Sequence, residues 1–222
     1  MSNPLPRYYA DMQCTQLSTT ALSSELRDGL VVVTLADTIF HPQGGGQPAD
    51  RGEILGSQGI LKVTQVRKRE DGAIEHIGTM SDGMIEPGEE VLCEIDTAWR
   101  QLHSRLHSAG HLLDVVLDQL SIQWQPGKGY HFADGPYVEY QTQETPDTEL
   151  AARIEATAAA LIATNTPTTI DLQGTTRIVR LGDKSVPCGG THVQALGEIG
   201  GLHIRYIKQK QGVVKIGYNI SP

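Results

Sequence analysis

The chain has 222 residues, of which 39% are hydrophobic and 20% charged, so it is not a disordered tail and can form two domains. Three widely spaced cysteines argue against a disulfide framework and indicate a reducing compartment. The first residues lack the apolar core of a signal peptide, and no apolar run approaches the roughly 18 residues of a membrane span. We therefore expect a cytoplasmic protein without a membrane partner.

The net charge of -8 has the wrong sign for a general nucleic-acid binder, but the charge is unevenly distributed. From Arg177 to the end there are seven Lys or Arg residues against two acids, whereas the rest of the chain holds 11 basic and 24 acidic residues. This basic region is either a solvated face or a surface for a polyanion.

The first 95 residues are expected to be β-structure. Three runs have strand character: "LVVVTL" (30–35), "GILKVTQVRK" (59–68) and "EVLCEI" (90–95). Glycine-containing turn signals separate them. Short strands with frequent turns predict a small β-barrel-like domain or sandwich over 1–95, with Cys14 and Cys93 as buried small side chains.

The pattern becomes helical at residue 96. Apolar residues recur at steps of three and four over 96–120, and Asp96 or Thr97 can cap the start of that helix. A second helix is expected over 145–165, with Thr145 or Asp147 near its cap. Strands are expected at both sides of an "ADG" turn within 127–141 and in the runs 168–173, 176–181, 201–209 and 213–220. Residues 96–222 therefore form a predicted α+β domain.

Four residues have the spacing of a metal site. His107 and His111 lie one helical turn apart on one face, and "VPCGGTHV" places Cys188 and His192 at the same spacing across two glycines. One thiolate and three imidazoles suit tetrahedral Zn2+. His103 is preferably a packing histidine. Gly110, inside the helix, costs about 1 kcal/mol against alanine. Either a close neighbour or a ligand needs its space, or the position is unoptimised.

The motifs "HSAGH" (107–111) and "PCGGTH" (187–192) resemble the zinc motifs of the alanyl-tRNA synthetase editing domain and of the freestanding AlaX editing proteins. The segment "FHPQGGGQPADRG" (40–52) is similar to the glycine-rich segment that precedes that domain in the synthetases and in longer AlaX members. The resemblance covers nearly the whole chain. It implies zinc-dependent hydrolysis, in trans, of the ester in mischarged seryl-tRNA(Ala) and also glycyl-tRNA(Ala).

By this resemblance, His107, His111, Cys188 and His192 bind one zinc ion per chain. Gln125 and Ser108 are candidate catalytic residues that would read the serine hydroxyl. Ser108 stands where the family usually has threonine. Asp114 and Glu139 are acid/base candidates without motif support. Four protein ligands are typical of a closed site, so either one ligand yields to water or the zinc only positions the substrate.

The tRNA-binding candidates are in two segments. Gly44, Gly45 and Gly46 form either a flexible hairpin loop or a site of close backbone approach to the tRNA, with Gln47 as an added side-chain contact. Alanines at these glycines are expected to reduce activity with zinc content unchanged. Lys208 and Lys210 are expected to contact tRNA phosphates.

Three functions remain open from the sequence. The first is the trans-editing deacylase, acting on mischarged tRNA(Ala) or on another tRNA such as Ser-tRNA(Thr). The second is a catalytically inactive, zinc-containing tRNA-binding protein, and the third is a zinc hydrolase for a small ester or amide. No obligate protein partner is evident.

Overall fold

The computed structural model describes residues 5–221. The chain divides into two compact units, one made of Met1–Gly44 and Pro48–Arg100 and the other of Gly45–Gln47 and Gln101–Pro222. Three residues of the glycine-rich segment, Gly45–Gln47, therefore belong to the second unit, whereas the residues on either side of them belong to the first. The division into domains at 1–95 and 96–222 stays a prediction.

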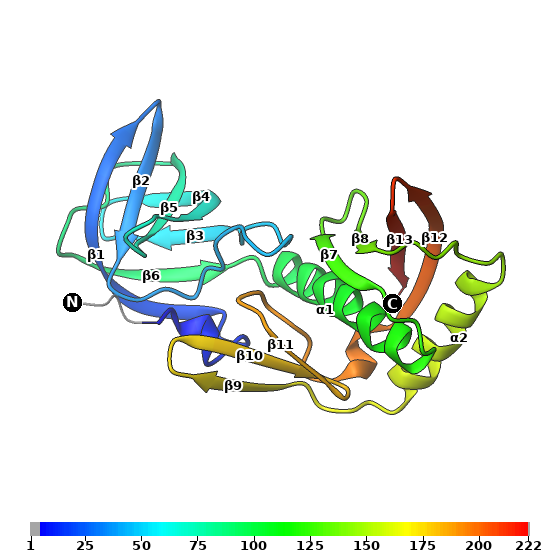
Figure 1. Ribbon diagram of the computed structural model, residues 1–222. Coiled ribbons are helices and arrows are strands. Elements are labelled where there is room, and N and C mark those ends of the chain that lie inside the picture. Colours follow the sequence, from blue (N-terminus) through cyan, green and yellow to red (C-terminus); the bar gives the residue numbers. More distant parts are fainter. Residues whose placement is uncertain (1–4, 222) are drawn as a thin grey trace. The chain divides into compact units, whose positions relative to one another are not determined.

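The first unit is a closed six-stranded barrel with strand order β1-β2-β5-β4-β3-β6 (Figure 1). Its strands alternate buried and exposed side chains, and the buried set fills the barrel interior. A short 3-10 helix, η1 (Arg7–Tyr9), precedes the strands. The strands are β1 (Gln16–Arg27), β2 (Leu30–Leu35), β3 (Gly52–Leu55), β4 (Ile60–Lys68), β5 (Ile74–Met80) and β6 (Glu90–Ile95). The expected barrel is confirmed.

The cysteines follow the prediction only in part. All three are free, so none forms a disulfide. Cys93 lies on β6 and is fully buried in the barrel core. Cys14 is partly exposed and precedes β1, because the first strand starts two residues later. The prediction of a buried side chain is therefore confirmed for Cys93 and wrong for Cys14.

Helix α1 (Thr97–Gln119) confirms the first predicted helix. Asp96, rather than Thr97, caps it, since its Oδ1 accepts a hydrogen bond of 2.9 Å from the Trp99 N–H. In the first unit, the buried Arg100 guanidinium donates to Asp50 at 2.9 Å. The Trp99 indole donates to the Ala49 carbonyl at 2.9 Å. These contacts hold the first turn of α1 against the barrel unit.

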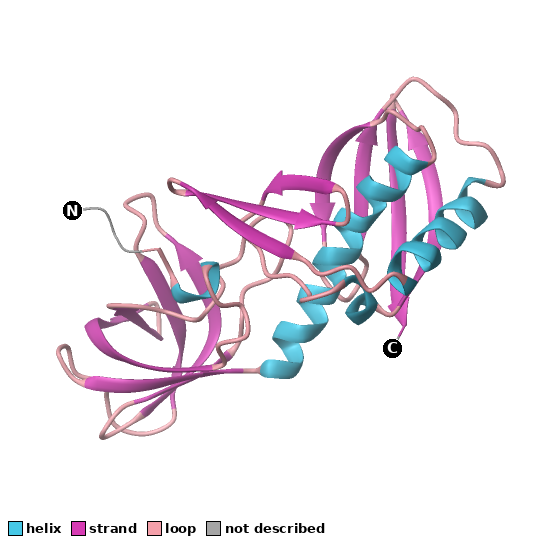
Figure 2. Cartoon of the chain, turned by 90° about the horizontal axis from the view of Figure 1, so that it is seen from below, coloured by secondary structure: helices cyan, strands magenta, loops and turns pink. Residues whose placement is uncertain are grey.

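The second unit contains an antiparallel four-stranded sheet with order β12-β13-β8-β7. The strands are β7 (Gln125–Tyr130), β8 (Tyr137–Gln141), β12 (Gly201–Lys210) and β13 (Val213–Ser221). Figure 2 shows both helices on the same face of this sheet. The core between them contains, among others, Leu112, Leu113, Val116, Ile154, Val214 and Ile216. The opposite face of the sheet is therefore not covered by either helix.

Helix α2 (Leu150–Ala163) is shorter than the predicted 145–165. Residues before it form a turn in which the Asp147 carboxylate accepts from the Glu149 N–H at 2.9 Å. Asp147 thus caps that turn, and α2 itself has no side-chain cap. Pro146 fits this turn, because proline disfavours helix in the residue before it.

A three-stranded sheet supports the loop that carries Cys188. It consists of β9 (Thr169–Gln173), β10 (Thr176–Leu181) and β11 (Lys184–Pro187), in the order β11-β10-β9. A short 3-10 helix, η2 (Leu196–Ile199), follows the loop. The whole is a β-rich α+β fold. Within residues 5–221, no helix is both long and apolar enough to span a membrane.

Candidate metal centre

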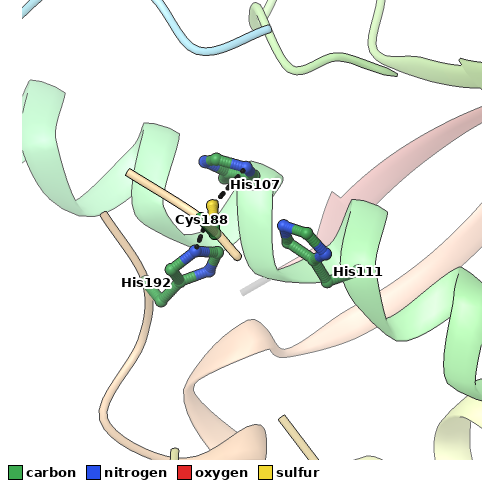
Figure 3. Close-up of side chains that lie close together, drawn as sticks. All are labelled: His107, His111, Cys188 and His192. Atoms are coloured by element: carbon green, nitrogen blue, oxygen red, sulfur yellow. Dashed lines mark hydrogen bonds between the residues drawn. The ribbon is translucent and has the colours of Figure 1, made fainter. Parts of the chain in front are cut away.

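Four side chains from two segments converge beside α1. His107 and His111 project from consecutive turns of the helix, and Cys188 and His192 come from the loop after β11 (Figure 3). One potential ligand atom from each residue lies within 4.8 Å of the others. His103 is buried and does not belong to this cluster. The tertiary fold therefore joins the two predicted halves of the site.

The spacing of the donor atoms fits a tetrahedral zinc site. The Cys188 Sγ lies 3.3 Å from the His192 Nε2 and 3.6 Å from the His107 Nε2. Two tetrahedral ligands with ordinary Zn–S and Zn–N bonds are about 3.5 Å apart. The thiolate and imidazole donors are also the types that zinc prefers.

Each histidine has an oxygen near its Nδ1, the ring nitrogen remote from the cluster centre. The His107 Nδ1 lies 2.7 Å from the Gln47 Oε1, and the His192 Nδ1 lies 3.1 Å from the Ser108 Oγ. The His111 Nδ1 faces the Asp114 carboxylate at 4.0 Å. An acceptor at Nδ1 favours the tautomer whose Nε2 lone pair is available to a metal. The arrangement therefore fits a metal better than a packed polar core.

The electrostatics without a metal favour the metal-binding form of His111 but not that of Cys188. Burial, followed by the charge of Lys184, lowers the pKa of His111 to about 4, so its imidazole is neutral at pH 7. Burial raises the pKa of the Cys188 thiol, while the Gly190 N–H and the Arg177 charge oppose this shift. A bound cation would add to these opposing effects and favour the thiolate.

Arg177 also shapes the cysteine loop. It is buried, and its Nη1 donates to the carbonyls of Cys188 and Gly190, both at 2.8 Å. Arg177 therefore does not belong to the exposed basic surface that was predicted for the segment from Arg177 to the end, and that prediction is wrong for this residue. The missed signal was its position in a strand that alternates buried and exposed residues.

Two glycines make room for the site. A Cβ at Gly190 would lie 2.3 Å from the His107 Nδ1, so only glycine lets the loop cross this ring. A Cβ at Gly110 would lie 2.3 Å from the His131 Cε1. Of the readings proposed for Gly110, a close neighbour is therefore the correct one, and that neighbour is His131.

His131 is a buried histidine that no motif in the sequence singles out. Its ring stacks on His107 with centroids 4.6 Å apart, and its Nδ1 lies 2.7 Å from the Tyr218 hydroxyl. Tyr218 donates to the Leu106 carbonyl, so its oxygen accepts from His131. Burial lowers the pKa of His131 to about 3, helped by His111. His131 is therefore a neutral side chain that packs against the ring of His107 and limits its movement.

The chain matches two family models. Residues 10–99 match class II (A) tRNA synthetases, and residues 176–216 match the second additional domain of threonyl- and alanyl-tRNA synthetases. The alanyl-tRNA editing protein AlaX-M of Pyrococcus horikoshii is 32% identical over 207 residues, which are 91% of this chain and 89% of that protein. This chain belongs to the AlaX family of alanyl-tRNA editing proteins.

Longer relatives match over part of their length. AlaX-L of the same organism is 28% identical over 232 residues, covering 95% of this chain but 56% of AlaX-L. The alanine-tRNA ligase of Halobacterium salinarum is 29% identical over 230 residues, covering 94% of this chain and 24% of the ligase. The chain thus spans about half of AlaX-L and about a quarter of the ligase.

Within this AlaX-family chain, residues 45–47 of the glycine-rich segment lie beside the candidate metal centre. Gly45 and Gly46 have φ angles of 57° and 78°, and the Gly46 carbonyl accepts from the His131 N–H at 2.8 Å. Gln47 is fully buried, and its amide also contacts the N–H and hydroxyl of Thr191 at 2.9 and 2.7 Å. Gln47 is therefore a support of His107, which differs from the tRNA contact predicted for it.

The other candidate residues are dispersed. Ser108 is fully buried, and its oxygen accepts from the Val193 N–H in addition to contacting His192. Gln125 is exposed at the first residue of β7, roughly 20 Å of extended strand from His131. Lys208 and Lys210 are exposed on β12. The structure brings Ser108 to the metal centre as a support and does not bring Gln125 there.

The two acid/base candidates are also engaged. Asp114 accepts from the Tyr140 hydroxyl at 2.8 Å, and burial raises the pKa of its carboxyl. Glu139 pairs with Lys215 at 2.9 Å on the four-stranded sheet. Asp114 therefore lies beside His111, whereas Glu139 belongs to a different surface.

Proposed function

We propose that the chain is a zinc-dependent hydrolase that deacylates mischarged tRNA(Ala), with seryl-tRNA(Ala) as its principal substrate. The observation that carries this proposal is the cluster of His107, His111, Cys188 and His192, with an oxygen near each Nδ1, in a chain of the AlaX family. One zinc ion per chain is expected. No protein partner is required for this reaction, and it takes place in the cytoplasm.

The chain's own residues prepare the centre for this chemistry. When bound, a zinc ion supplies a positive charge that can polarise an ester carbonyl and acidify water. Gln47 orients His107, Ser108 orients His192, and Arg177 holds the cysteine loop. These fixed supports reduce the reorganisation that the reaction requires.

The exposure of the four donors indicates the side from which substrate arrives. His107 and His192 are buried, whereas His111 and Cys188 are partly exposed. We therefore expect an ester to approach from the side of His111 and Cys188. His111 and Cys188 would also be the two donors accessible to water if they held a zinc ion.

Discrimination between seryl and alanyl esters requires recognition of a hydroxyl. Serine is alanine plus one hydroxyl, so a pocket that admits serine by size also admits alanine. A site that hydrogen-bonds a substrate hydroxyl can reject the analogue lacking it by roughly 10^4-fold. The buried and engaged Ser108 oxygen is a poor candidate for this contact, and so is the distant Gln125. The metal centre itself is the better candidate.

The test is a deacylation assay of the full chain against Ser-, Gly- and Ala-tRNA(Ala) and Ser-tRNA(Thr). We expect rapid loss of serine from tRNA(Ala), slower loss of glycine, and very slow loss of alanine. Equal rates for serine and alanine would refute the editing role. Faster hydrolysis of Ser-tRNA(Thr) than of Ser-tRNA(Ala) would show that Ser-tRNA(Thr) is the principal substrate.

The same preparation tests the metal and the competing functions. Metal analysis should give about one zinc per chain, and Cys188→Ala should lower that content. Binding of tRNA without any deacylation would favour the inactive tRNA-binding protein. Hydrolysis of small esters that is insensitive to salt and to added tRNA would favour the small-molecule hydrolase.

A further inference from the structure

The uncovered face of the four-stranded sheet carries a row of aromatic side chains across its strands. Tyr130 on β7 pairs with Tyr137 on β8, Tyr137 pairs with Gly217 on β13, and Gly217 pairs with Tyr206 on β12. The side chains of Val138, Tyr140, Val214 and Ile216 point to the opposite, helix-covered face. Aromatic rings thus occupy three of the four positions in one row.

The rings at one end of this row form a stack. Tyr130 and Phe132 have centroids 4.5 Å apart and planes inclined by 12°, and Tyr130 and Tyr137 have centroids 5.4 Å apart and planes inclined by 17°. Tyr130, Phe132 and Tyr137 are all only partly buried. Among the described residues, Tyr130 is the only ring stacked on Phe132, so Phe132 is the terminal ring of this stack.

Tyr206 forms the other end of the row. A Cβ at Gly217 would lie 2.4 Å from the Tyr206 Cε1, so the ring leans over this glycine. Arg205 and Lys208 approach the same ring, with 5.4 Å and 4.9 Å from the charged group to the centroid. Tyr206 is therefore a partly exposed ring in a cationic setting.

A row of positive charge flanks the aromatic row. Lys208 on β12 pairs with Lys215 on β13, and the Lys215 Nζ lies 3.8 Å from the Tyr137 centroid. The segment 201–222 contains four Lys or Arg residues and no acid, in a chain with a net charge of -8. Two acids lie nearby: Glu139 pairs with Lys215, and Asp134 accepts from the Tyr130 hydroxyl at 3.1 Å.

We propose that this face, defined by Phe132, Tyr130, Tyr137, Tyr206, Lys208 and Lys215, binds unpaired nucleotides of RNA by stacking bases on its rings and pairing phosphates with its lysines. Aromatic side chains with neighbouring cations are typical of surfaces for single-stranded nucleic acid. A duplex does not fit equally well, because its bases already stack on one another. We call the four aromatic residues of this face, Phe132, Tyr130, Tyr137 and Tyr206, the stacking row.

The stacking row is continuous with the metal centre through one short segment. Tyr130 and Phe132 belong to the stacking row, whereas His131, which lies between them in the sequence, stacks on His107. β7 is an edge strand, so a single strand of RNA can pass over it from one face of the sheet to the other. This inference rests on the proposed tRNA substrate, whose single-stranded 3′ end carries the ester.

The test compares two uncharged RNA hairpins, one with a short single-stranded 3′ end and one that ends blunt, by fluorescence anisotropy with the full chain. We expect the first hairpin to bind more tightly. Phe132→Leu and Tyr206→Leu should each weaken its binding about tenfold and leave the blunt hairpin unchanged. Tyr206→Phe, which keeps the ring, should bind like the parent chain within about twofold.

Leu172→Ala, an exposed apolar substitution on β9, serves as a control outside the stacking row. Circular dichroism checks that each variant is folded. Because the two leucine substitutions lie on different segments, the test can still be made with one of them if the other fails to fold. Equal binding of both hairpins by the parent chain would overturn the proposal, as would leucine variants that keep the preference for the single-stranded end.

Failure of the proposed function gives a different result. If the chain deacylates no mischarged tRNA but prefers the single-stranded end through these rings, the stacking row stands and the catalytic proposal falls. If deacylation is present and the leucine variants change neither binding nor KM, the catalytic proposal stands and the stacking row falls.

Discussion

At the scale of single residues, Gln47 joins two parts of the candidate metal centre, His107 on α1 and Thr191 in the cysteine loop. Its Oε1 accepts from the His107 Nδ1 and the Thr191 N–H, while its Nε2 donates to the Thr191 hydroxyl. One amide therefore orients a candidate ligand on α1, His107, and fixes the loop that carries two others, Cys188 and His192. An apolar side chain of similar size would leave all three groups buried without this partner.

Gln47→Leu should weaken zinc binding by about 10–100-fold, because supports of this kind contribute that much to metal affinity. Competition with a chromophoric chelator measures the change. Gln43→Leu is the matched control, since Gln43 is exposed in the same segment. Unchanged zinc affinity in the Gln47 variant would show that His107 does not depend on this hydrogen bond.

At the scale of elements, the three glycines of the glycine-rich segment are not equivalent. Gly46 has a φ of 78°, and a Cβ there would lie 2.3 Å from the Gly129 carbonyl oxygen on β7. Gly44 lacks a positive φ, and the nearest atom to its Cβ would be 3.9 Å away. The requirement for glycine is therefore imposed by the approach to a strand and does not apply to the whole run.

Gly46→Ala should lower both the melting temperature of the second unit and its zinc affinity, since the segment must withdraw from β7 and carries Gln47 with it. Gly44→Ala should change neither. This revises the expectation that alanines at these glycines leave zinc content unchanged. Thermal unfolding and zinc titration of the two variants decide between the readings, and equal behaviour would restore the interpretation as a simple loop.

At the scale of the whole molecule, the concentration of positive charge near the C-terminus should dominate tRNA binding. Lys208→Glu with Lys210→Glu should weaken binding of all tRNAs to a similar extent, because phosphate contacts carry no sequence information. The salt slope should decrease by about one per lysine. The charge-preserving pair Lys208→Arg and Lys210→Arg is the control. A loss confined to one tRNA would contradict this assignment.

Acid should destabilise the barrel unit through His76. Complete burial lowers the pKa of His76 from 6.5 to about 4, against a weaker opposing effect of the Val33 carbonyl. Between these two values the unfolded chain binds the proton and the folded chain does not. The free energy of unfolding should therefore fall as the pH falls through this range, by about 3 kcal/mol in all.

Urea unfolding followed by Trp99 fluorescence, in a Trp124→Phe background, measures this dependence. His76→Gln should be less stable at pH 7, but its unfolding free energy should lack this part of the pH dependence. His203→Gln, which removes an exposed histidine, should retain it. An identical pH profile in His76→Gln and the parent chain would assign the acid sensitivity to other groups.

The sequence by itself determined most of the elements and singled out the four residues of the candidate metal centre. Strands such as 30–35 and 90–95 and the helix near 97–119 follow from local periodicity, which a residue pattern records directly. The four donors were recognisable because Cys188–His192 and His107–His111 share a spacing of four. Both signals are local, so no knowledge of distant contacts was required.

The tertiary structure alone decided what surrounds those donors. Gln47, Ser108 and His131 reach the centre through contacts separated by 60, 84 and, for His131 and Tyr218, 87 residues. Burial of Arg177 and the need for Gly110 likewise depend on which side chain lies opposite. Such contacts arise from the packing of elements remote in the chain, and no local pattern in the sequence encodes which of them will meet.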